Sequence, residues 1–180
     1  MQAKTFHIEG PLLITPMIFQ DERGCFYESF NQLKFEKFVS GTIFVQDNES
    51  CSHKGVIRGL HFQNPPHAQG KLVRVVKGSV LDVAVDIRKN SSTYGQHISV
   101  ELSALNHEML WIPPGFAHGF LSLEDDTIFL YKCTNNYNKE SEGGLLWNDE
   151  SININWGIEN PIVSEKDMEL MSFSNLISKF

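Results

Sequence analysis

The chain has 180 residues, of which 41% are hydrophobic and 21% charged. These proportions are typical of a globular protein and exclude a disordered one, and the length suits a domain with a core of its own. The formal net charge of -7 argues against non-specific nucleic-acid binding through a basic face. We therefore expect one domain over residues 1–180.

The cysteines and the N-terminus indicate the compartment. Cys25, Cys51 and Cys133 are far apart, odd in number and form no CxxC pair. Neither a disulfide framework nor a zinc knuckle is therefore indicated. The first residues lack the apolar stretch of a signal peptide, and no later run is long enough to cross a bilayer. We expect a cytoplasmic protein.

The chain reads as one short strand after another. A short helix is expected over 31–38, and strands over 72–76 and 80–87 should form a hairpin around the turn Lys77-Gly78-Ser79. Residues 80–87 alternate, which places Asp82, Ala84 and Asp86 on one face. Further strands are expected over 97–102, 109–112, 120–123 and 127–133, and a capped helix should start at 164–167.

Many short strands at regular spacing predict an all-β antiparallel sandwich or barrel with a few short helices, one near the C-terminus. Inward-facing positions of a small barrel can enclose a ligand. Polar residues on the inner side of the strands are therefore the candidates for chemistry.

Two segments combine polar side chains with glycine. In Gly55–Gln63, alternation places Arg58 and Leu60 on one face of a strand and His61 on the other. A histidine in such a strand is, from the pattern alone, more often a satisfied structural side chain than a catalyst. The second segment, Pro113-x-Gly115-x-x-His118, has the spacing of the second signature of cupin barrels. It predicts a cupin-like jelly roll with His118 at the barrel mouth.

A metal-binding cupin would carry a His-x-His pair on an earlier strand, followed by a glutamate. Here the matching triplet is His61-Phe62-Gln63, and no glutamate stands within the next ten residues. Transition metals generally need several converging histidine or carboxylate ligands, and His61 with His118 would be a poor set. We expect neither a metal nor another cofactor.

Eight segments in order resemble one family. They are 21–28 (DERGCFYE), 46–48 (QDN), 58–63 (RGLHFQ), 69–72 (QGKL), 82–88 (DVAVDIR), 113–120 (PPGFAHGF), 131–134 (YKCT) and 147–149 (WND). Together they resemble the dTDP-4-dehydrorhamnose 3,5-epimerase family over residues 10–170. That family serves bacterial surface-sugar synthesis, including lipopolysaccharide. The resemblance implies a metal-independent epimerase that acts on C3 and C5 of a dTDP-4-keto-6-deoxy-hexose.

The resemblance also implies catalytic roles. The C4 ketone acidifies the hydrogens on C3 and C5, so that a base can remove one and an acid can return a proton to the opposite face. His61 matches the base, and Tyr131 matches the acid on the other side of the cavity. Asp167 matches the carboxylate that orients the base, and Lys71 the ammonium beside the ketone oxygen.

Each of these assignments has a structural alternative. Asp167 could simply sit in the first turn of a helix capped by Ser164, where negative charge is favoured. Tyr131 shares a strand face with Phe129 and Cys133 and could be a packing residue. Lys71 could be a solvated lysine at a strand end. The sequence leaves these alternatives open.

Substrate contacts and a partner follow from the same resemblance. Arg23 and Arg58 match residues that engage the diphosphate, and Tyr137 matches the aromatic that stacks on the base. Tyr137 and Glu142 could equally be surface loop residues. Relatives are usually homodimers that exchange N-terminal strands, so a homodimer is expected, with part of the site lined by the other subunit. The remaining matched contacts are Glu28, Gln46, Asp47, Asn48, His118 and Glu142.

Three competing functions stay open from the sequence. The nearest is an epimerase that acts at one carbon only or on another nucleotide sugar. The second is a metal-dependent cupin enzyme, and the third is a non-catalytic sugar-binding module.

Overall fold

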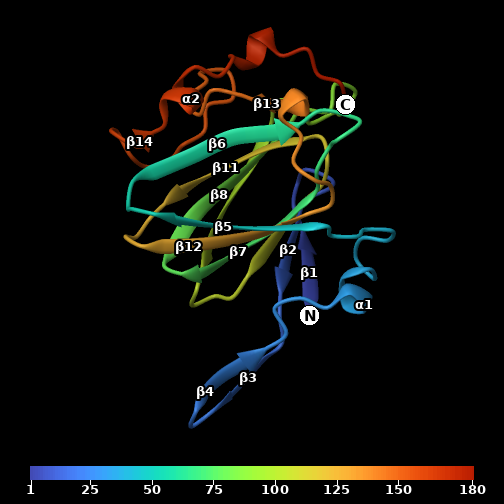
Figure 1. Ribbon diagram of the computed structural model, residues 1–180, viewed down its shortest axis with the longest axis vertical. Coiled ribbons are helices and arrows are strands. Elements are labelled where there is room, and N and C mark those ends of the chain that lie inside the picture. Colours follow the sequence, from blue (N-terminus) through green and yellow to red (C-terminus); the bar gives the residue numbers. More distant parts are fainter.

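The computed structural model describes residues 1–180, and two sheets, antiparallel except for the parallel pair of β14 and β6, face each other across its interior (Figure 1). The first sheet has the order β1-β2-β10-β7-β12-β5. Its strands are β1 (Gln2–Thr5), β2 (Leu12–Thr15), β5 (Gln46–Ser52), β7 (Lys71–Lys77), β10 (Met109–Ile112) and β12 (Thr127–Cys133). The second sheet has the order β13-β6-β11-β8-β9, and β14 pairs with β6. Its strands are β6 (Val56–Gln63), β8 (Ser79–Asp86), β9 (His97–Ser103), β11 (Phe116–Ser122), β13 (Glu142–Gly144) and β14 (Ile162–Val163).

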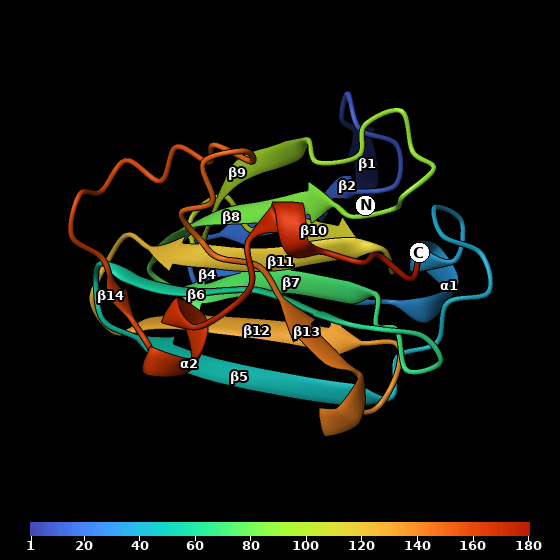
Figure 2. The same cartoon turned by 90° about the horizontal axis from the view of Figure 1, so that it is seen from above.

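Two large apolar clusters hold these layers together. The inner cluster lies between the sheets and includes Val75 and Phe129 from the first and Phe120 from the second. The outer face of the second sheet packs against the C-terminal segment through residues such as Leu145 and Trp156. Figures 1 and 2 show this segment crossing over β6 and β11. Burial of this apolar surface is the main stabilising term of the fold.

Helices are few and short, as the sequence predicts. Helix α1 (Gln32–Phe35) begins at Asn31, whose side chain accepts a hydrogen bond from the Lys34 backbone N–H at 3.1 Å. Helix α2 (Glu165–Met168) lies near the C-terminus, and two 3-10 turns cover Lys139–Ser141 and Phe173–Asn175. Helix α1 is shorter than the 31–38 expected, and helix α2 begins after its cap Ser164 as expected. The all-β fold class is confirmed.

The predicted hairpin of 72–76 and 80–87 is wrong. Both strands exist, but β7 pairs with β10 and β12, whereas β8 pairs with β9 and β11. Gly78, with a φ of +78°, carries the chain from one sheet to the other. Both faces of β8 are apolar, with Ala84 in the inner cluster and Val83 in the outer one. Such a strand needs cover on both faces, and the second sheet has it, since the first sheet lies on one side and the C-terminal segment on the other.

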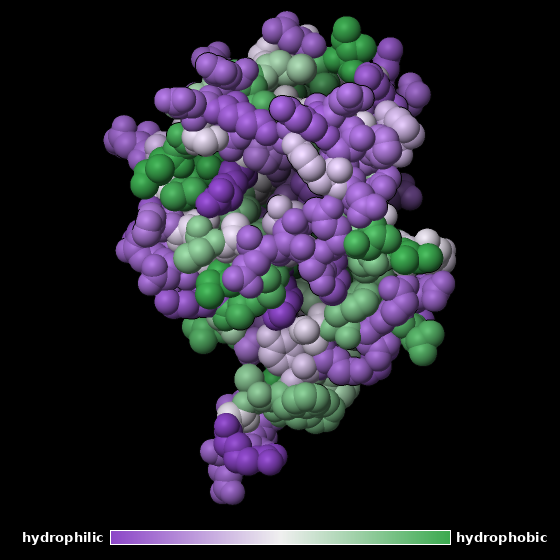
Figure 3. Space-filling view, in the orientation of Figure 1, coloured by the Kyte–Doolittle hydropathy of each residue, from purple (hydrophilic) through white to green (hydrophobic).

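One hairpin projects from the barrel. Strands β3 (Ile18–Asp21) and β4 (Gly24–Tyr27) pair only with each other and extend away from both sheets (Figure 1). Phe19 and Phe26 are 58% and 68% exposed. In Figure 3 the projection is apolar towards the barrel and polar at its tip. Exposed aromatic side chains on an isolated two-stranded hairpin are typical of an interaction surface.

A buried carboxylate fixes the turn after β8. Asp86 accepts hydrogen bonds from Arg88 Nη2 at 2.7 Å, Ser91 Oγ at 2.6 Å and Thr93 Oγ1 at 2.7 Å. Burial raises the pKa of Asp86, but these hydrogen bonds outweigh it and bring the pKa down from 3.8 to about 2. The ionised carboxylate therefore stabilises the folded state.

We expect Asp86→Asn to lower the free energy of unfolding at pH 7 by about 2 kcal/mol. Because the folded-state pKa is depressed, this stabilisation is present above about pH 4 and is lost as the pH falls towards 2. Urea unfolding of the unaltered protein and of Asp86→Asn should show that the difference between their free energies of unfolding becomes smaller from pH 7 to pH 3. Asp47→Asn removes an exposed pair with Lys132 and should change little. A difference in free energy of unfolding that does not vary with pH would contradict this account.

Candidate active site

The predicted catalytic side chains line one cavity between the two sheets. Two adjoining pockets of about 330 and 400 Å³ share His61, Lys71 and Tyr131. His61 comes from β6 in the second sheet, whereas Lys71 and Tyr131 come from β7 and β12 in the first. The two walls therefore contribute different groups, and the histidine and the tyrosine reach the cavity from opposite sheets.

A bulge in β6 determines which side chains reach this cavity. In the ladder with β11, His61 pairs with His118 and Arg58 with Phe120, so β6 has one residue more than its partner between these positions. Arg58 and His61 consequently both line the cavity, whereas Leu60 packs in the outer cluster. The expected alternation, with Arg58 and Leu60 on one face, is wrong here because the bulge shifts it by one residue.

His61 is paired with Asp167. Its Nε2 lies 2.7 Å from Asp167 Oδ1, and the Gly59 backbone N–H donates to Oδ2 at 3.2 Å. Asp167 is only 5% exposed. Burial raises the pKa of Asp167, but the hydrogen bonds from His61 and Gly59 and the nearby positive charges outweigh it, so the pKa lies below its ordinary value. The ionised carboxylate can thus orient the imidazole and stabilise its protonated form.

The helix-cap interpretation of Asp167 holds as well. Ser164 is the N-cap of α2, and its side chain accepts a hydrogen bond from the Asp167 backbone N–H at 3.1 Å. Helix α2 is thereby fixed so that the Asp167 carboxylate points at β6. The cap and the pair are two parts of one arrangement.

Tyr131 and Lys71 face the same space as His61. Burial raises the pKa of Tyr131, which keeps its hydroxyl protonated and able to donate. Lys71 lies inside the cavity and its Nζ donates to the His61 carbonyl at 3.4 Å, so it is not a solvated strand-end lysine. Burial also lowers the pKa of Lys71. The cavity thus holds a base candidate, an acid candidate and a cation.

Polar residues at the rim form a second group. Gln46 Oε1 accepts from the Tyr137 backbone N–H at 2.8 Å, and its Nε2 donates to Asn48 at 3.0 Å. Glu142 accepts from the Tyr137 hydroxyl at 3.3 Å and from Lys166 Nζ at 2.7 Å. The smaller of the two pockets is lined by four residues that the sequence matched to substrate contacts: Gln46, Asn48, Tyr137 and Glu142.

Three residues matched to substrate contacts do not face this cavity within the chain. Arg23 lies on the projecting hairpin and pairs with Asp21 at 2.5 Å. Glu28, just after the hairpin, bonds to Lys34. Asp47 points away from the interior and pairs with Lys132 at 2.9 Å, because its neighbours Gln46 and Asn48 occupy the inward positions of β5.

Sequence reasoning missed two residues of the site, one that lines the cavity and one that lies behind His118. Lys166 lines the larger pocket and reaches Glu142 at 2.7 Å. Its place beside Asp167 was the only signal for it. Asp82 is completely buried and lies 3.0 Å from His118 Nε2. The alternation of residues 80–87 placed Asp82 on one face with Ala84 and Asp86, but it indicated neither the inner side nor a partner.

The residue at the second histidine position of metal cupins has another task here. Gln63 is buried, and its Nε2 donates to the backbone carbonyls of His67 at 2.7 Å and Asn136 at 3.2 Å. Its Oε1 accepts from the Asn138 backbone N–H at 2.7 Å. Gln63 thus anchors the loop that carries Tyr137. No group of three or more histidine, cysteine or acidic side chains converges in a metal-binding arrangement.

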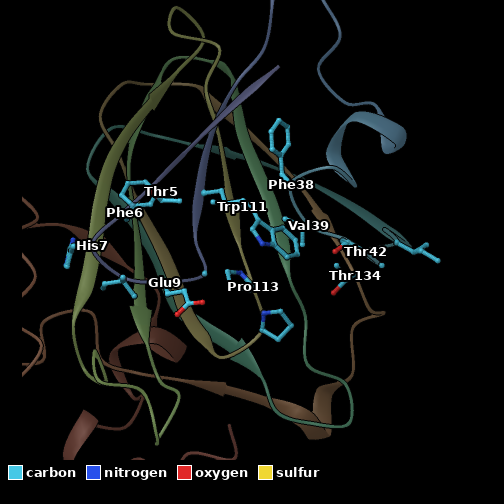
Figure 4. Close-up of a pocket in the computed structure, with 16 residues that line it drawn as sticks. Thr5, Phe6, His7, Glu9, Phe38, Val39, Thr42, Trp111, Pro113 and Thr134 are labelled. Carbon is cyan, nitrogen blue, oxygen red and sulfur yellow. The ribbon is translucent and has the colours of Figure 1, made fainter.

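The largest cavity lies elsewhere. It measures about 830 Å³ and is bounded by the N-terminal strands, the 38–43 loop and the end of β10 (Figure 4). Trp111 and Pro113 line it together with His7 and Glu9, but none of the residues matched to catalysis or binding does. The cavity that His61, Lys71 and Tyr131 line is the better candidate for the active site because its polar groups converge from both sheets.

The site requires glycine at position 59, where the backbone has a positive φ and β6 lies very close to β11. The φ of Gly59 is +128°, and a Cβ at this position would lie 2.5 Å from Gly119 Cα and 2.8 Å from the His118 carbonyl oxygen. Backbone strain and overpacking would each add roughly 1–3 kcal/mol. We expect Gly59→Ala to lower the free energy of unfolding by about 3 kcal/mol or more, measured by urea titration.

The matched control is Gly24→Ala. Gly24 has a similar φ of +117°, but nothing lies within 4 Å of a Cβ there. This variant should show the strain alone. Equal losses for the two substitutions would mean that the close approach of β6 and β11 does not require glycine.

A jelly-roll barrel that aims a histidine–carboxylate pair and a tyrosine into one cavity has the architecture of an acid–base enzyme. The model of the family described as dTDP-4-dehydrorhamnose 3,5-epimerase matches residues 5–175. The chain belongs to this family. The cupin-like jelly roll expected from the sequence is confirmed by the solved structures that share the fold.

Individual proteins of this family are similar to the chain over most of its length. A dTDP-4-dehydrorhamnose 3,5-epimerase of Shigella flexneri is 56% identical over 167 residues, which cover 92% of each chain. An epimerase structure from Legionella pneumophila in complex with dTDP-4-keto-L-rhamnose is 45% identical, with a TM-score of 0.93 over 98% of this chain and 94% of that one. A 3′-monoepimerase from Streptomyces bikiniensis in complex with dTDP-quinovose is 31% identical, with a TM-score of 0.89 over 94% of this chain and 86% of that one.

Proposed function

We propose that this protein inverts C3 and C5 of a dTDP-4-keto-6-deoxy-hexose, giving dTDP-4-keto-L-rhamnose. The observation that carries the proposal is the placement of the His61–Asp167 pair and Tyr131 in one cavity, on opposite sheets. An inversion needs a base on one face of the sugar and an acid on the other. Family membership supports the substrate, because the relative from Legionella pneumophila binds the expected product.

The chemistry follows from the groups in the cavity. The Nε2 of His61 is engaged by Asp167, so Nδ1 is the nitrogen that takes the proton from C3 or C5. The C–H electron pair then forms the enolate, and the negative charge on the ketone oxygen is stabilised by the Lys71 ammonium. Tyr131 gives its proton to the carbon from the opposite face. Proton exchange with solvent afterwards returns His61 and Tyr131 to their starting states.

Deuterium exchange tests this function. In heavy water, the dTDP-4-keto-6-deoxyglucose substrate should acquire deuterium at both C3 and C5, as followed by NMR or mass spectrometry. His61→Asn should slow both exchanges by about 10²- to 10⁴-fold. His53→Asn is the matched control, because His53 is exposed and lies outside the cavity. Label at only one carbon would favour a mono-epimerase, and unchanged exchange in His61→Asn would exclude the assigned base.

We further propose that the active form is a homodimer in which the projecting hairpin completes the site of the other subunit. The hairpin carries exposed aromatic side chains, and its strands pair with neither sheet of its own barrel. Arg23 is 85% exposed at its side chain and lies outside the cavity of its own chain. A second barrel would cover the apolar surface and receive the guanidinium, which is suited to a diphosphate.

Mixing two inactive variants tests this sharing. Arg23→Gln and His61→Asn would each be impaired alone, but a mixed dimer contains one site with both His61 and the partner's Arg23 intact. We expect activity to return when the variants are unfolded and refolded together. If Arg23 serves its own subunit, every site stays damaged and mixing restores nothing. A mass of one 20.5 kDa chain in solution would also oppose the dimer.

The absence of a metal requirement is part of the proposal. It is supported by the use of Gln63 as a loop anchor where metal cupins carry a histidine. Stoichiometric iron, manganese or nickel in the purified active protein would overturn it. The cytoplasmic location and the role in surface-sugar synthesis stay predictions. No helix is long and apolar enough to cross a membrane.

A further inference from the structure

A second histidine–carboxylate pair stands beside the first. His118 on β11 pairs with His61 on β6 in the antiparallel ladder, so the two imidazoles are cross-strand neighbours. The Nε2 of His118 lies 3.1 and 3.0 Å from the two carboxylate oxygens of Asp82 on β8. Asp82 is 0% exposed, and His118 supplies its only side-chain hydrogen bonds. The chemistry proposed above assigns no task to Asp82.

Burial determines the charge of His118. The side chain of His118 is only 7% exposed, and burial, together with the nearby Lys71 and His61, lowers its pKa in spite of Asp82, which acts in the opposite direction. The imidazole is therefore neutral near pH 7, with a proton on one nitrogen only. Which nitrogen carries it depends on Asp82. A carboxylate can only accept, so it requires Nε2–H, whereas a protonated carboxyl group would donate to Nε2 and leave the proton on Nδ1.

The geometry of the pair favours the carboxylate. The Nε2 of His118 lies at nearly equal distances, 3.1 and 3.0 Å, from the two Asp82 oxygens, as an N–H shared between them would, whereas a carboxyl O–H would donate from one oxygen only. Burial raises the pKa of Asp82 overall, and the positive charge of nearby Lys71 acts against this shift. On this geometry, ionised Asp82 accepts the Nε2 proton of His118.

We propose that Asp82 is a positioning residue: it holds His118 as the neutral Nε2–H tautomer and leaves Nδ1 to accept a hydrogen bond from a hydroxyl of the sugar. A ketone oxygen has no proton to give, so Nδ1 cannot bind it. Lys71 can only donate and therefore suits the ketone oxygen. This division would fix the sugar with its ketone at Lys71 and a hydroxyl at His118. The identity of the ligand rests on the proposed function, but the tautomer does not.

Nitrogen NMR of histidine-labelled protein tests the tautomer without substrate or catalysis. The ring nitrogens of His118, assigned by comparison with His118→Gln, should show a protonated Nε2 and an unprotonated Nδ1 in the unaltered protein. A protonated Nδ1 would overturn the proposal. Because this measurement needs no other variant to fold, it stands even if Asp82 proves essential for stability.

Asp82→Asn tests the link to the substrate. An amide can both donate and accept, so Nε2–H is no longer enforced and a mixture of tautomers is expected in the same spectra. Loss of the oriented acceptor should lower kcat/KM by about tenfold. Asp82→Glu keeps a carboxylate and should retain the Nε2–H tautomer. Asp126→Asn, which changes an exposed carboxylate outside the cavity, is the matched control.

A substrate lacking one hydroxyl separates positioning from general damage. The 2-deoxy and 3-deoxy analogues of the substrate each lack one hydroxyl, and one of them lacks the hydroxyl that His118 binds. With that analogue, the unaltered protein and Asp82→Asn should exchange deuterium at C5 at similar rates, because neither can form the hydrogen bond. If Asp82→Asn stays about tenfold slower than the unaltered protein with both analogues, Asp82 acts on structure alone. If the unaltered protein shows no exchange at all, the proposed function fails while the tautomer result remains valid.

Discussion

The hydrogen bond between His61 and Asp167 is the contact on which the site depends, and it joins residues 106 positions apart in the chain. Asp167 reaches β6 only because the C-terminal segment packs along the outer face of the second sheet. The bulge at Gly59 supplies a backbone N–H to the same carboxylate and brings His61 to the cavity side. Packing of one apolar surface thus sets the geometry of one polar pair.

The two-sheet architecture then supplies the opposing group. Tyr131 belongs to the first sheet and His61 to the second, and the inner apolar cluster holds the sheets at a fixed separation. Phe129 in this cluster stacks against Phe120 and lies near both His118 and Tyr131, with ring centroids 4.2 to 6.1 Å apart. The base and acid candidates therefore lie on opposite walls of one cavity, which offers space for a ligand.

Much of the fold could be predicted from the sequence, because alternation in single strands is a local property. The strand at 80–87 and the inward face of Tyr131 are examples. The hairpin around Gly78 was wrong because the choice of sheet depends on contacts with distant strands. Arg58 was placed on the wrong face because no residue pattern announces a bulge. The alternation placed Asp82 on one face of its strand, but neither the inward direction of that face nor its partner on β11 could be predicted, because both are tertiary properties.

The two histidine–carboxylate pairs differ in one physical respect, which is access to solvent. The side chain of His61 is 34% exposed and that of His118 only 7%. An imidazole open to the cavity can become charged, release its proton to water and start another cycle. A buried imidazole is held neutral, so it can orient a ligand but is poorly suited to carry protons. Similar side chains at neighbouring positions of adjacent strands can therefore perform different tasks, because burial differs between them.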